Sequence, residues 1–381
     1  MSPRIGKTSD EMVTLFLCGD VMTGRGVDQI MAHPCEPTLD ESYVKDAREY
    51  WHLAERAHGA VQRPVDEDYI WGDALEMWDR MKPDLRLVNL ETSITTSDDA
   101  WPGKGIHYRM SPKNVGCLTA AQIDCCALAN NHVLDWGRAG LTETLDTLRR
   151  VGTTTCGAGE NRAEAASPAV LRAHQSCRVL VFSFGVETSG IPFTWAANDN
   201  RIGVNWLPDL SEPSIEQVAE TLAPHRKNDD IIIVSIHWGG NWGYEAEPGE
   251  QYFARQLIER AGVDLVHGHS SHHPKGIEVH RDRLILYGCG DFLTDYEGIS
   301  GYERFRGDLS LMYFADVQPS SGRLARLQMV PLQMRRLQLR RADSDDVTWL
   351  SNVLTREGQL FGTRVSQAAE DTLALEWSRK G

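Results

Sequence analysis

The sequence lacks any run of about 18 or more apolar residues, which is the length that a membrane-spanning helix needs. Its first apolar run, residues 13–18, is too short for the hydrophobic part of a secretory signal and favours a strand. The eight cysteines include no CxxC pair, which disfavours a zinc–thiolate site. Reduced, buried thiols are typical of the cytoplasm, and we therefore expect a cytoplasmic protein with no membrane partner.

Basic charge is also scarce. The chain has 39 Lys and Arg residues against 54 Asp and Glu residues, which gives a formal net charge of −15. This excess of acidic groups disfavours nucleic acid and anionic membranes as partners. The hydrophobic fraction of 41% and the charged fraction of 24% are those of a globular protein, so they exclude a disordered or fibrous chain.

Several catalytic and nucleotide-binding motifs are absent. The sequence contains no Walker loop, no complete GxGxxG fingerprint, no GxSxG elbow and no HExxH. The stretch from Gly157 to Gly159 follows a short strand but lacks the rest of the dinucleotide fingerprint. These absences disfavour a dinucleotide enzyme and a serine hydrolase, and we expect no organic cofactor.

Apolar, strand-like runs alternate along the chain with segments of helical periodicity, which is typical of an α/β fold. The expected strands are 13–19, 85–89, 124–129, 178–185, 230–236, 264–267, 277–280, 283–288, 309–316 and 324–332. The expected helices are 41–58, 72–81, 112–121, 138–151, 212–223, 249–262, 345–357 and 364–377. We expect residues 1–11 to form a flexible tail, 12–343 to form one domain, and 344–381 to form helices packed on that domain. Residues 186–210 predict a long loop.

Polar side chains follow the ends of six expected strands. They are Asp20; Glu91; Asn131, His132 and Asp135; His237; His269, His272 and His273; and Asp291 with Asp295. In open α/β sheets ligands bind beyond the carboxyl ends of the strands, so these side chains are expected to converge. A single Asp or Asn after a strand is more often a turn former or a helix cap. Six such ends together favour a composite metal or acid–base site, because oxygen and imidazole donors suit a divalent cation.

The strand-end clusters, taken in order, resemble the poly-γ-glutamate capsule-synthesis (CapA-like) family of the calcineurin-like metallophosphoesterase superfamily. The matching stretches include GDVMTGRG at 19–26, VNLETSI at 88–94, ALANNHVLDWGRAG at 127–140, HWGGNWGYE at 237–245, HGHSSHHPKGIEV at 267–279 and LYGCGDFLTDYEG at 286–298. The resemblance implies an α/β sandwich of the calcineurin-like metallophosphatase type, with two mixed β-sheets flanked by helices.

The resemblance also implies a set of metal ligands. By position in the motifs these are Asp20, Glu91, Asn131 and His237, while His269 and His272 match the histidines of the last motif, the second of them displaced. Two departures stand out, because Met22 replaces the usual first-motif histidine and Glu91 replaces an aspartate. Both weaken a tight two-metal centre and favour a single hard cation such as Ca, Mg or Mn.

With one metal, the remaining histidines and carboxylates are available for proton transfer. His132 and Asp135 are three residues apart at an expected helix start, so that one can orient the other. His269, His272 and His273 can pair in the same way with Asp291 or Asp295. A His–Asp pair on each side of a substrate carbon could remove a proton from one face and deliver one to the other, as an epimerase requires.

Substrate contacts are expected from Trp238 and Trp242, which flank a Gly-rich turn next to His237, and from His273 and Arg109. For the tryptophans a core role is an equal alternative; for Arg109, which suits a bidentate anion clamp, the alternative is a surface salt bridge.

The whole chain is most similar to the family's peptide-modifying branch, the lasso-peptide epimerases that invert the C-terminal tryptophan of a ribosomal precursor peptide. That similarity implies a metal-dependent peptide epimerase. The alternatives are a metal-dependent phosphoesterase or amide hydrolase on the same site, related to polyglutamate or capsule, and a non-catalytic accessory protein. The sequence favours no particular oligomeric state.

Overall fold

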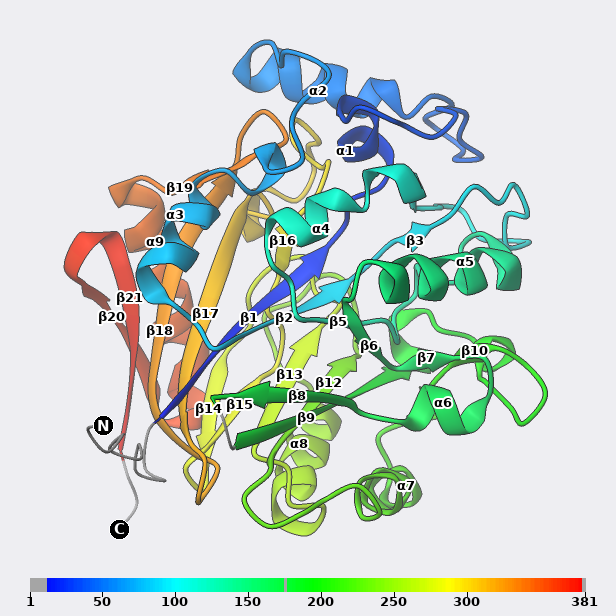
Figure 1. Cartoon of the computed structure of the whole chain (residues 1–381). Helices are drawn as coiled ribbons and strands as arrows, with labels where there is room; N and C mark the ends of the chain where they lie inside the picture. Colours follow the sequence, from blue (N-terminus) through cyan, green and yellow to red (C-terminus); the bar gives the residue numbers. More distant parts are fainter. Residues whose placement is uncertain (1–11, 175–176, 379–381) are drawn as a thin grey trace, which may run out of the picture.

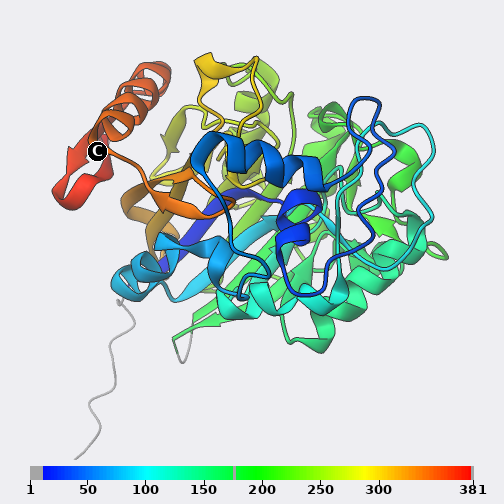
Figure 2. The same cartoon turned by 90° about the horizontal axis from the view of Figure 1, so that it is seen from above.

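The computed structural model describes residues 12–174 and 177–378. Two β-sheets face each other, and helices cover their outer faces (Figure 1). Figure 2, which looks down from above, shows α1 and α2 over the middle of the molecule and α9 at one side. Each sheet contains parallel and antiparallel pairs, which confirms the predicted α/β sandwich of two mixed sheets. The tail predicted for residues 1–11 lies outside the described residues.

The first sheet has a parallel half and an antiparallel half. Its order is β20 (Thr363–Ala368), β21 (Thr372–Trp377), β18 (Arg323–Met334), β17 (Leu309–Gln318), β1 (Val13–Val21), β2 (Leu85–Leu90), β5 (Cys125–Ala127) and β6 (Thr154–Cys156). Two further strands join it, β16 (Asp291–Leu293) beside β1 and β19 (Leu339–Arg341) beside β18. Strand β1 is parallel to β2 and β16 and antiparallel to β17, so it forms the boundary between the two halves.

The second sheet is mostly parallel. Its order is β11 (Trp206–Leu207), β9 (Cys177–Val186), β12 (Ile231–His237), β13 (Leu265–His269), β15 (Arg283–Leu286) and β14 (Ile277–His280), with β8 (Ala169–Ala173) beside β9. Two small ladders pair β3 (Ser93–Ile94) with β4 (Arg109–Met110) and β7 (Ala158–Gly159) with β10 (Gly203–Val204). The short strands β10 and β11 fall within the predicted loop 186–210.

Nine helices cover the sheets or connect their strands within the described residues. They are α1 (Arg25–Ile30), α2 (Arg48–His58), α3 (Asp73–Met81), α4 (Gly116–Ala120), α5 (Gly137–Arg150), α6 (Arg162–Ala166), α7 (Glu212–Leu222), α8 (Pro248–Arg260) and α9 (Ser344–Gly358). Helix α8 shows why such a segment begins where it does. Glu247 and Glu250 form a reciprocal capping box around Pro248, which suits the first turn.

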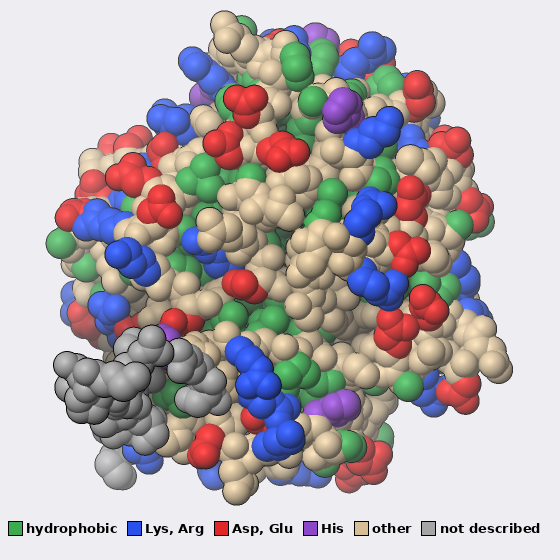
Figure 3. Space-filling view, viewed as in Figure 1, with side chains coloured by type: hydrophobic (Ala, Val, Ile, Leu, Met, Phe, Trp, Pro, Cys, Tyr) green, Lys and Arg blue, Asp and Glu red, His purple; other side chains and the backbone are tan. Residues whose placement is uncertain are grey.

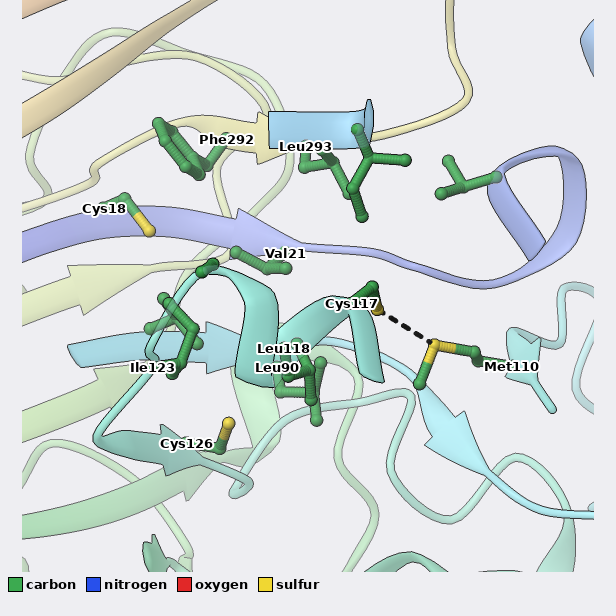
Figure 4. Packing of buried hydrophobic residues seen from close by; sticks show 14 of the residues in the cluster. Cys18, Val21, Leu90, Met110, Cys117, Leu118, Ile123, Cys126, Phe292 and Leu293 are labelled. Carbon is green, nitrogen blue, oxygen red and sulfur yellow. Dashed lines mark hydrogen bonds between the residues drawn. The ribbon is translucent and has the colours of Figure 1, made fainter. Parts of the chain in front are cut away.

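Within the described residues, three of the four hydrophobic clusters pack against the faces of the two sheets, because the strands bury side chains on both faces. Along β1, Leu15 and Leu17 belong to the core between the sheets, whereas Phe16 points to the outer core under α3 and α4. A third core lies between the second sheet and helices α7 and α8. Figure 4 shows part of the outer core, where the thiol of Cys117 lies 3.8 Å from the sulfur of Met110. The eight cysteines are free thiols.

The predicted helix 364–377 is wrong, because this segment forms the hairpin β20–β21. In β20 Thr363 and Val365 are buried while Arg364 is exposed, which is the period of a strand. The chain reverses at Glu370 and Asp371, both with positive φ, and β21 then pairs with β18. The C-terminal region therefore extends the first sheet, and within its described residues, 344–378, α9 is the one α-helix. The predicted helix 41–58 begins later, at Arg48.

The surface carries charges of both signs. On the face seen in Figure 3, acidic and basic side chains are interspersed, so the net negative charge forms no single patch there. Within residues 12–174 and 177–378, no helix is both long enough and apolar enough to cross a membrane.

Candidate metal centre and acid–base site

Strand β1 places Asp20 at the centre of the site, between β2 and β16. Asp20 is in register with Asn89 on one side and with Asp291 on the other. The preceding residue must be small, because a Cβ at Gly19 would lie 1.5 Å from the carbonyl oxygen of Gly290. The glycine thus lets the two chain segments approach closely and brings the Asp20 and Asp291 carboxylates together.

Three buried carboxylates converge at this point. Oxygen atoms of Asp20, Glu91 and Asp291 all lie within 4.8 Å of one another. Burial raises the pKa of Asp20 to about 7, and the charge of Asp291 adds to the effect. Burial likewise raises the pKa of Glu91 well above its usual value, with contributions from both aspartates. Negative charge concentrated in this way calls for protons or a cation.

Two histidines complete a second group around Asp20. His237 ends β12 and His269 ends the neighbouring strand β13, and the two are in register. Their Nδ1 atoms are 2.7 Å apart, and with Asp20 they offer three ligand atoms within 4.8 Å. Burial lowers the pKa of both histidines well below the usual value. Both rings are therefore neutral near pH 7, which is the form that binds metal.

The donor set fits a divalent cation. Nε2 of His237 lies 3.1 Å from Oδ1 of Asn131 and 3.9 Å from a carboxylate oxygen of Glu91. A site that gathers more lone pairs than protons, from oxygen and imidazole nitrogen, has the chemistry of a metal centre. The structure thus brings together the four predicted ligands, Asp20, Glu91, Asn131 and His237. It adds His269 and Asp291, for which the sequence had predicted proton transfer.

A histidine–aspartate pair adjoins this centre in the turn before α5. Nδ1 of His132 is 2.7 Å from Oδ2 of Asp135, and Nε2 of His132 is 3.8 Å from a carboxylate oxygen of Glu91. Tyr108 stacks on the imidazole at 3.7 Å, and its backbone N–H donates to Asp135. The Lys104 ammonium also donates to Asp135. Burial, followed by the charge of Lys104, lowers the pKa of His132 well below its usual value, so the ring is neutral and can accept a proton.

A second pair lies at Asp291. Nδ1 of His272 is 3.0 Å from Oδ1 of this carboxylate. Burial lowers the pKa of His272, but the charge and hydrogen bond of Asp291 outweigh burial and raise it overall. One imidazole therefore lies near Glu91 and another near Asp291, and both of these residues belong to the cluster of three buried carboxylates.

Asp295, which the sequence assigned to proton transfer, has a different partner. Its Oδ2 accepts from Nε of Arg25 at 3.1 Å and from the backbone N–H of Gly26 at 2.9 Å. Arg25 also donates to Glu41 and lies over the ring of Tyr50 at 3.9 Å. The structure thus places Asp295 as the counter-ion of a buried guanidinium, outside the two sets of candidate metal ligands.

Two of the predicted substrate residues do not reach the centre. Trp238 is 1% exposed, packs against Tyr287 and Phe253 in the core, and donates from its indole to the carbonyl of Tyr287. Arg109 donates to Asp98 and lines a separate depression. These positions match the core and salt-bridge alternatives that the sequence left open for the two residues.

Trp242 and His272 line one cavity of about 570 Å³, and His273 stacks on Trp242 with ring centroids 6.1 Å apart. The cavity extends from Asp291 past Tyr296 to the surface at Tyr302. Trp242 stacks on Tyr302 with ring centroids 4.0 Å apart. His273 is fully buried and stacks on Phe305. The cavity therefore joins an aromatic wall directly to the second His–Asp pair.

Sequence reasoning missed several residues that shape the site. Lys104 and Tyr108 belong to the stretch GKGIHYRM, from which Arg109 was selected and these two residues were not. A run of Lys, His, Tyr and Arg in one loop was an available signal. Arg25 gave no signal of its own, because its acidic partner Asp295 lies 270 positions away.

Comparison with known proteins identifies similar chains. The family model described as "Bacterial capsule synthesis protein PGA_cap" matches residues 14–296. A probable polyglutamine synthesis accessory protein of Mycobacterium tuberculosis (strain ATCC 25618 / H37Rv) is 46% identical over 369 residues, or 96% of each chain. The PGA biosynthesis protein CapA of Bacillus subtilis (strain 168) is 25% identical over 313 residues, 82% of this chain and 70% of that protein. The capsule biosynthesis protein CapA of Bacillus anthracis is 22% identical over 305 residues, 80% of this chain and 64% of that protein.

Proposed function

Since the chain belongs to the bacterial capsule synthesis protein family PGA_cap, we propose that it is a metal-dependent hydrolase of amide bonds in a peptide-like substrate. The observation that carries the proposal is the His132–Asp135 pair beside Glu91 of the metal-ligand groups. The names of the relatives support an amide-linked substrate, because polyglutamine is an amide-linked polymer.

The proposed metal is Mn, Mg or Ca, held by Asp20, Glu91, Asn131 and His237 together with His269 and Asp291. Imidazole ligands favour Mn over the two harder cations. When bound, such a cation polarises the carbonyl oxygen of the substrate as a Lewis acid.

His132 is the proposed proton carrier. The carboxylate of Asp135 accepts from Nδ1–H, which leaves the Nε2 lone pair of His132 directed to the side of Glu91. Nε2 takes a proton from the attacking water and then gives it to the leaving nitrogen. Asp135 stabilises the cationic ring between these steps, and Lys104 and Tyr108 hold Asp135 in place.

The test compares His132→Gln with the wild-type protein on γ-glutamyl oligomers and on an aromatic peptide amide, each with Mn²⁺. Loss of the proton carrier should lower kcat by about 10²–10⁴-fold and leave the Mn²⁺ affinity unchanged. His280→Gln is the matched control, because His280 lies on β14 and pairs with Glu259. An unchanged kcat in His132→Gln would exclude this mechanism. Cleavage of bis(p-nitrophenyl) phosphate instead of the amides would move the activity to phosphoesters.

A second candidate is peptide epimerisation, which the presence of two His–Asp pairs favours. His132–Asp135 and His272–Asp291 can serve as the two acid–base groups, without Asp295. The substrate would be a ribosomal precursor peptide whose C-terminal side chain, proposed to be tryptophan, packs against Trp242. In deuterated buffer this reaction adds one deuterium at the α-carbon and yields a D-residue without cleavage. That result would replace the hydrolase proposal.

The site of action is proposed to be the cytoplasm. The eight free cysteines support this location, because a reducing compartment keeps thiols unpaired.

A further inference from the structure

A buried chain of hydrogen bonds runs behind His269, on the side of the ring that faces away from Asp20. Nε2 of His267 is 2.6 Å from the carbonyl oxygen of Cys18, and Nδ1 of His267 is 3.0 Å from Oγ of Ser235. The same Oγ is 2.9 Å from Nε2 of His269. Ser235, His267 and His269 are each 0% exposed, so these contacts have no competition from solvent.

The protons along this chain can be assigned from its fixed end. A carbonyl oxygen only accepts, so His267 must carry its proton on Nε2. The ring of His267 is fully buried and its polar contacts are to the carbonyl of Cys18 and the hydroxyl of Ser235, neither of which is anionic, so the ring is neutral and its Nδ1 is an acceptor. The Ser235 hydroxyl has a single proton, which it donates to that Nδ1. Oγ of Ser235 must then accept from His269, whose proton is therefore on Nε2.

This assignment determines whether the ring nitrogen of His269 that faces the other candidate ligands carries a proton. A neutral ring with its proton on Nε2 has a free lone pair on Nδ1. That Nδ1 lies 2.7 Å from Nδ1 of His237 and 3.8 Å from a carboxylate oxygen of Asp20. We propose that Ser235 and His267 are positioning residues that fix the tautomer of His269, so that Nδ1 is its metal-binding atom. This inference rests on the proposed metal dependence.

A serine at position 235 is unexpected in this strand. It interrupts the buried run Ile231–Ile236 of β12, in which the other residues are Ile or Val and pack in the cores. An apolar side chain would suit such a strand equally well. Ser235 is in register with His267 and stands two residues before His237, so its side chain lies on the same face of the sheet as these histidines.

The first measurement follows Mn²⁺ binding by titration calorimetry in the full chain. Removing an outer hydrogen-bond partner of a ligand histidine typically weakens metal binding by about 10–100-fold, and we expect this range for Ser235→Ala. Ser235→Thr keeps the hydroxyl and should restore most of the affinity. The matched control is Ser310→Ala, another buried strand serine, whose Oγ donates to the carbonyl of Phe292; its affinity should stay within about two-fold of wild type. Wild-type affinity in folded Ser235→Ala would overturn the proposal.

The second measurement needs neither turnover nor metal. Nitrogen-15 NMR of the histidine side chains in the metal-free wild-type protein reports which ring nitrogen of His269 carries the proton, with His269→Gln used for assignment. A proton on Nε2 supports the inference, and a proton on Nδ1 overturns it, even if Ser235→Ala does not fold. Absence of Mn²⁺ binding by the wild-type protein would instead refute the proposed metal dependence, while the tautomer still decides the inference.

Discussion

Arg25 and Asp295 show how much of the site's structure depends on single buried charges. Both side chains are almost fully enclosed, with exposures of 2% and 0%. The guanidinium bonds to Asp295 and to Glu41 and lies against the rings of Tyr50 and Tyr108. Such a pair contributes less by its attraction than it costs when one partner is removed, because the remaining buried charge then loses most of its compensation; for Arg25 only Glu41 would remain of the two carboxylates.

Replacing Asp295 by Asn should therefore destabilise the fold by about 3–5 kcal/mol. Urea unfolding followed by circular dichroism measures this change in the free energy of unfolding. Asp146→Asn is the control, because Asp146 pairs with Arg149 at the surface, where both side chains are 58% exposed and the pair contributes about 0–1 kcal/mol. Equal effects of the two substitutions would show that Arg25 has other compensation.

At the scale of elements, the site depends on the close approach of β1 to the segment before β16. Strand β1 shifts register at Asp20, where it pairs with Asp291 on one side and with Asn89 on the other. Gly19 allows this approach, since nearly any side chain there would meet the backbone at Gly290. The separation of two metal-ligand carboxylates is thus set by a contact between backbones.

Gly19→Ala tests this dependence. The added methyl group forces the strands apart and should cost about 1–3 kcal/mol, as overpacking of a tight interior does. Because Asp20 and Asp291 then separate, Mn²⁺ affinity measured by calorimetry should fall at least ten-fold. Gly240→Ala is the control, since a Cβ at Gly240 meets nothing within 4 Å and its effect on stability should stay within about 0.5 kcal/mol. Unchanged Mn²⁺ affinity in Gly19→Ala would show that the spacing of the carboxylates does not depend on this contact.

At the scale of the whole molecule, the ligand groups join the two sheets. Asp20 and Glu91 come from β1 and the end of β2 in the first sheet, whereas His237 and His269 end strands of the second sheet. A cation bound to both sets is a link between the two halves of the sandwich. Binding that favours the folded state adds directly to its stability.

Mn²⁺ should therefore raise the stability of the metal-free protein by about 2.7 kcal/mol at a free concentration of about 100 times Kd. Thermal unfolding with Mn²⁺ and with EDTA measures the difference. Burial raises the pKa of Asp20 to about 7, so between its ordinary value and about pH 7 this carboxyl group holds more protons in the folded metal-free protein than in the unfolded chain. The contribution of Asp20 to stability, measured as the difference between wild type and Asp20→Asn, should therefore fall as the pH rises through this interval, and the gain from Mn²⁺ should grow. A gain that is the same in Asp20→Asn would place the bound metal elsewhere.

The sequence by itself determined the features that depend on local pattern. The run before Asp20 predicted β1, and the runs before Asn131, His237 and His269 predicted the strands whose carboxyl ends meet at the site. Alternating strands and helices fixed the fold class, because each pattern records which faces are buried. Chemical type was also readable, since carboxylates and imidazoles that follow such strands converge at one edge.

Only the tertiary structure decided the pairings between distant residues. Asp295 belongs to Arg25, 270 positions away, and nothing near either residue in the chain indicates it. Trp238 and Trp242 are four residues apart, yet one packs in the core and the other lines the cavity. The hairpin β20–β21 was predicted as a helix because its place in the sheet depends on the pairing of β21 with β18, whose paired residues lie 44 and 46 positions earlier in the chain. The proposed role of Ser235 could be inferred only from its distances to two histidines on β13, because these side chains come into contact only when the chain folds.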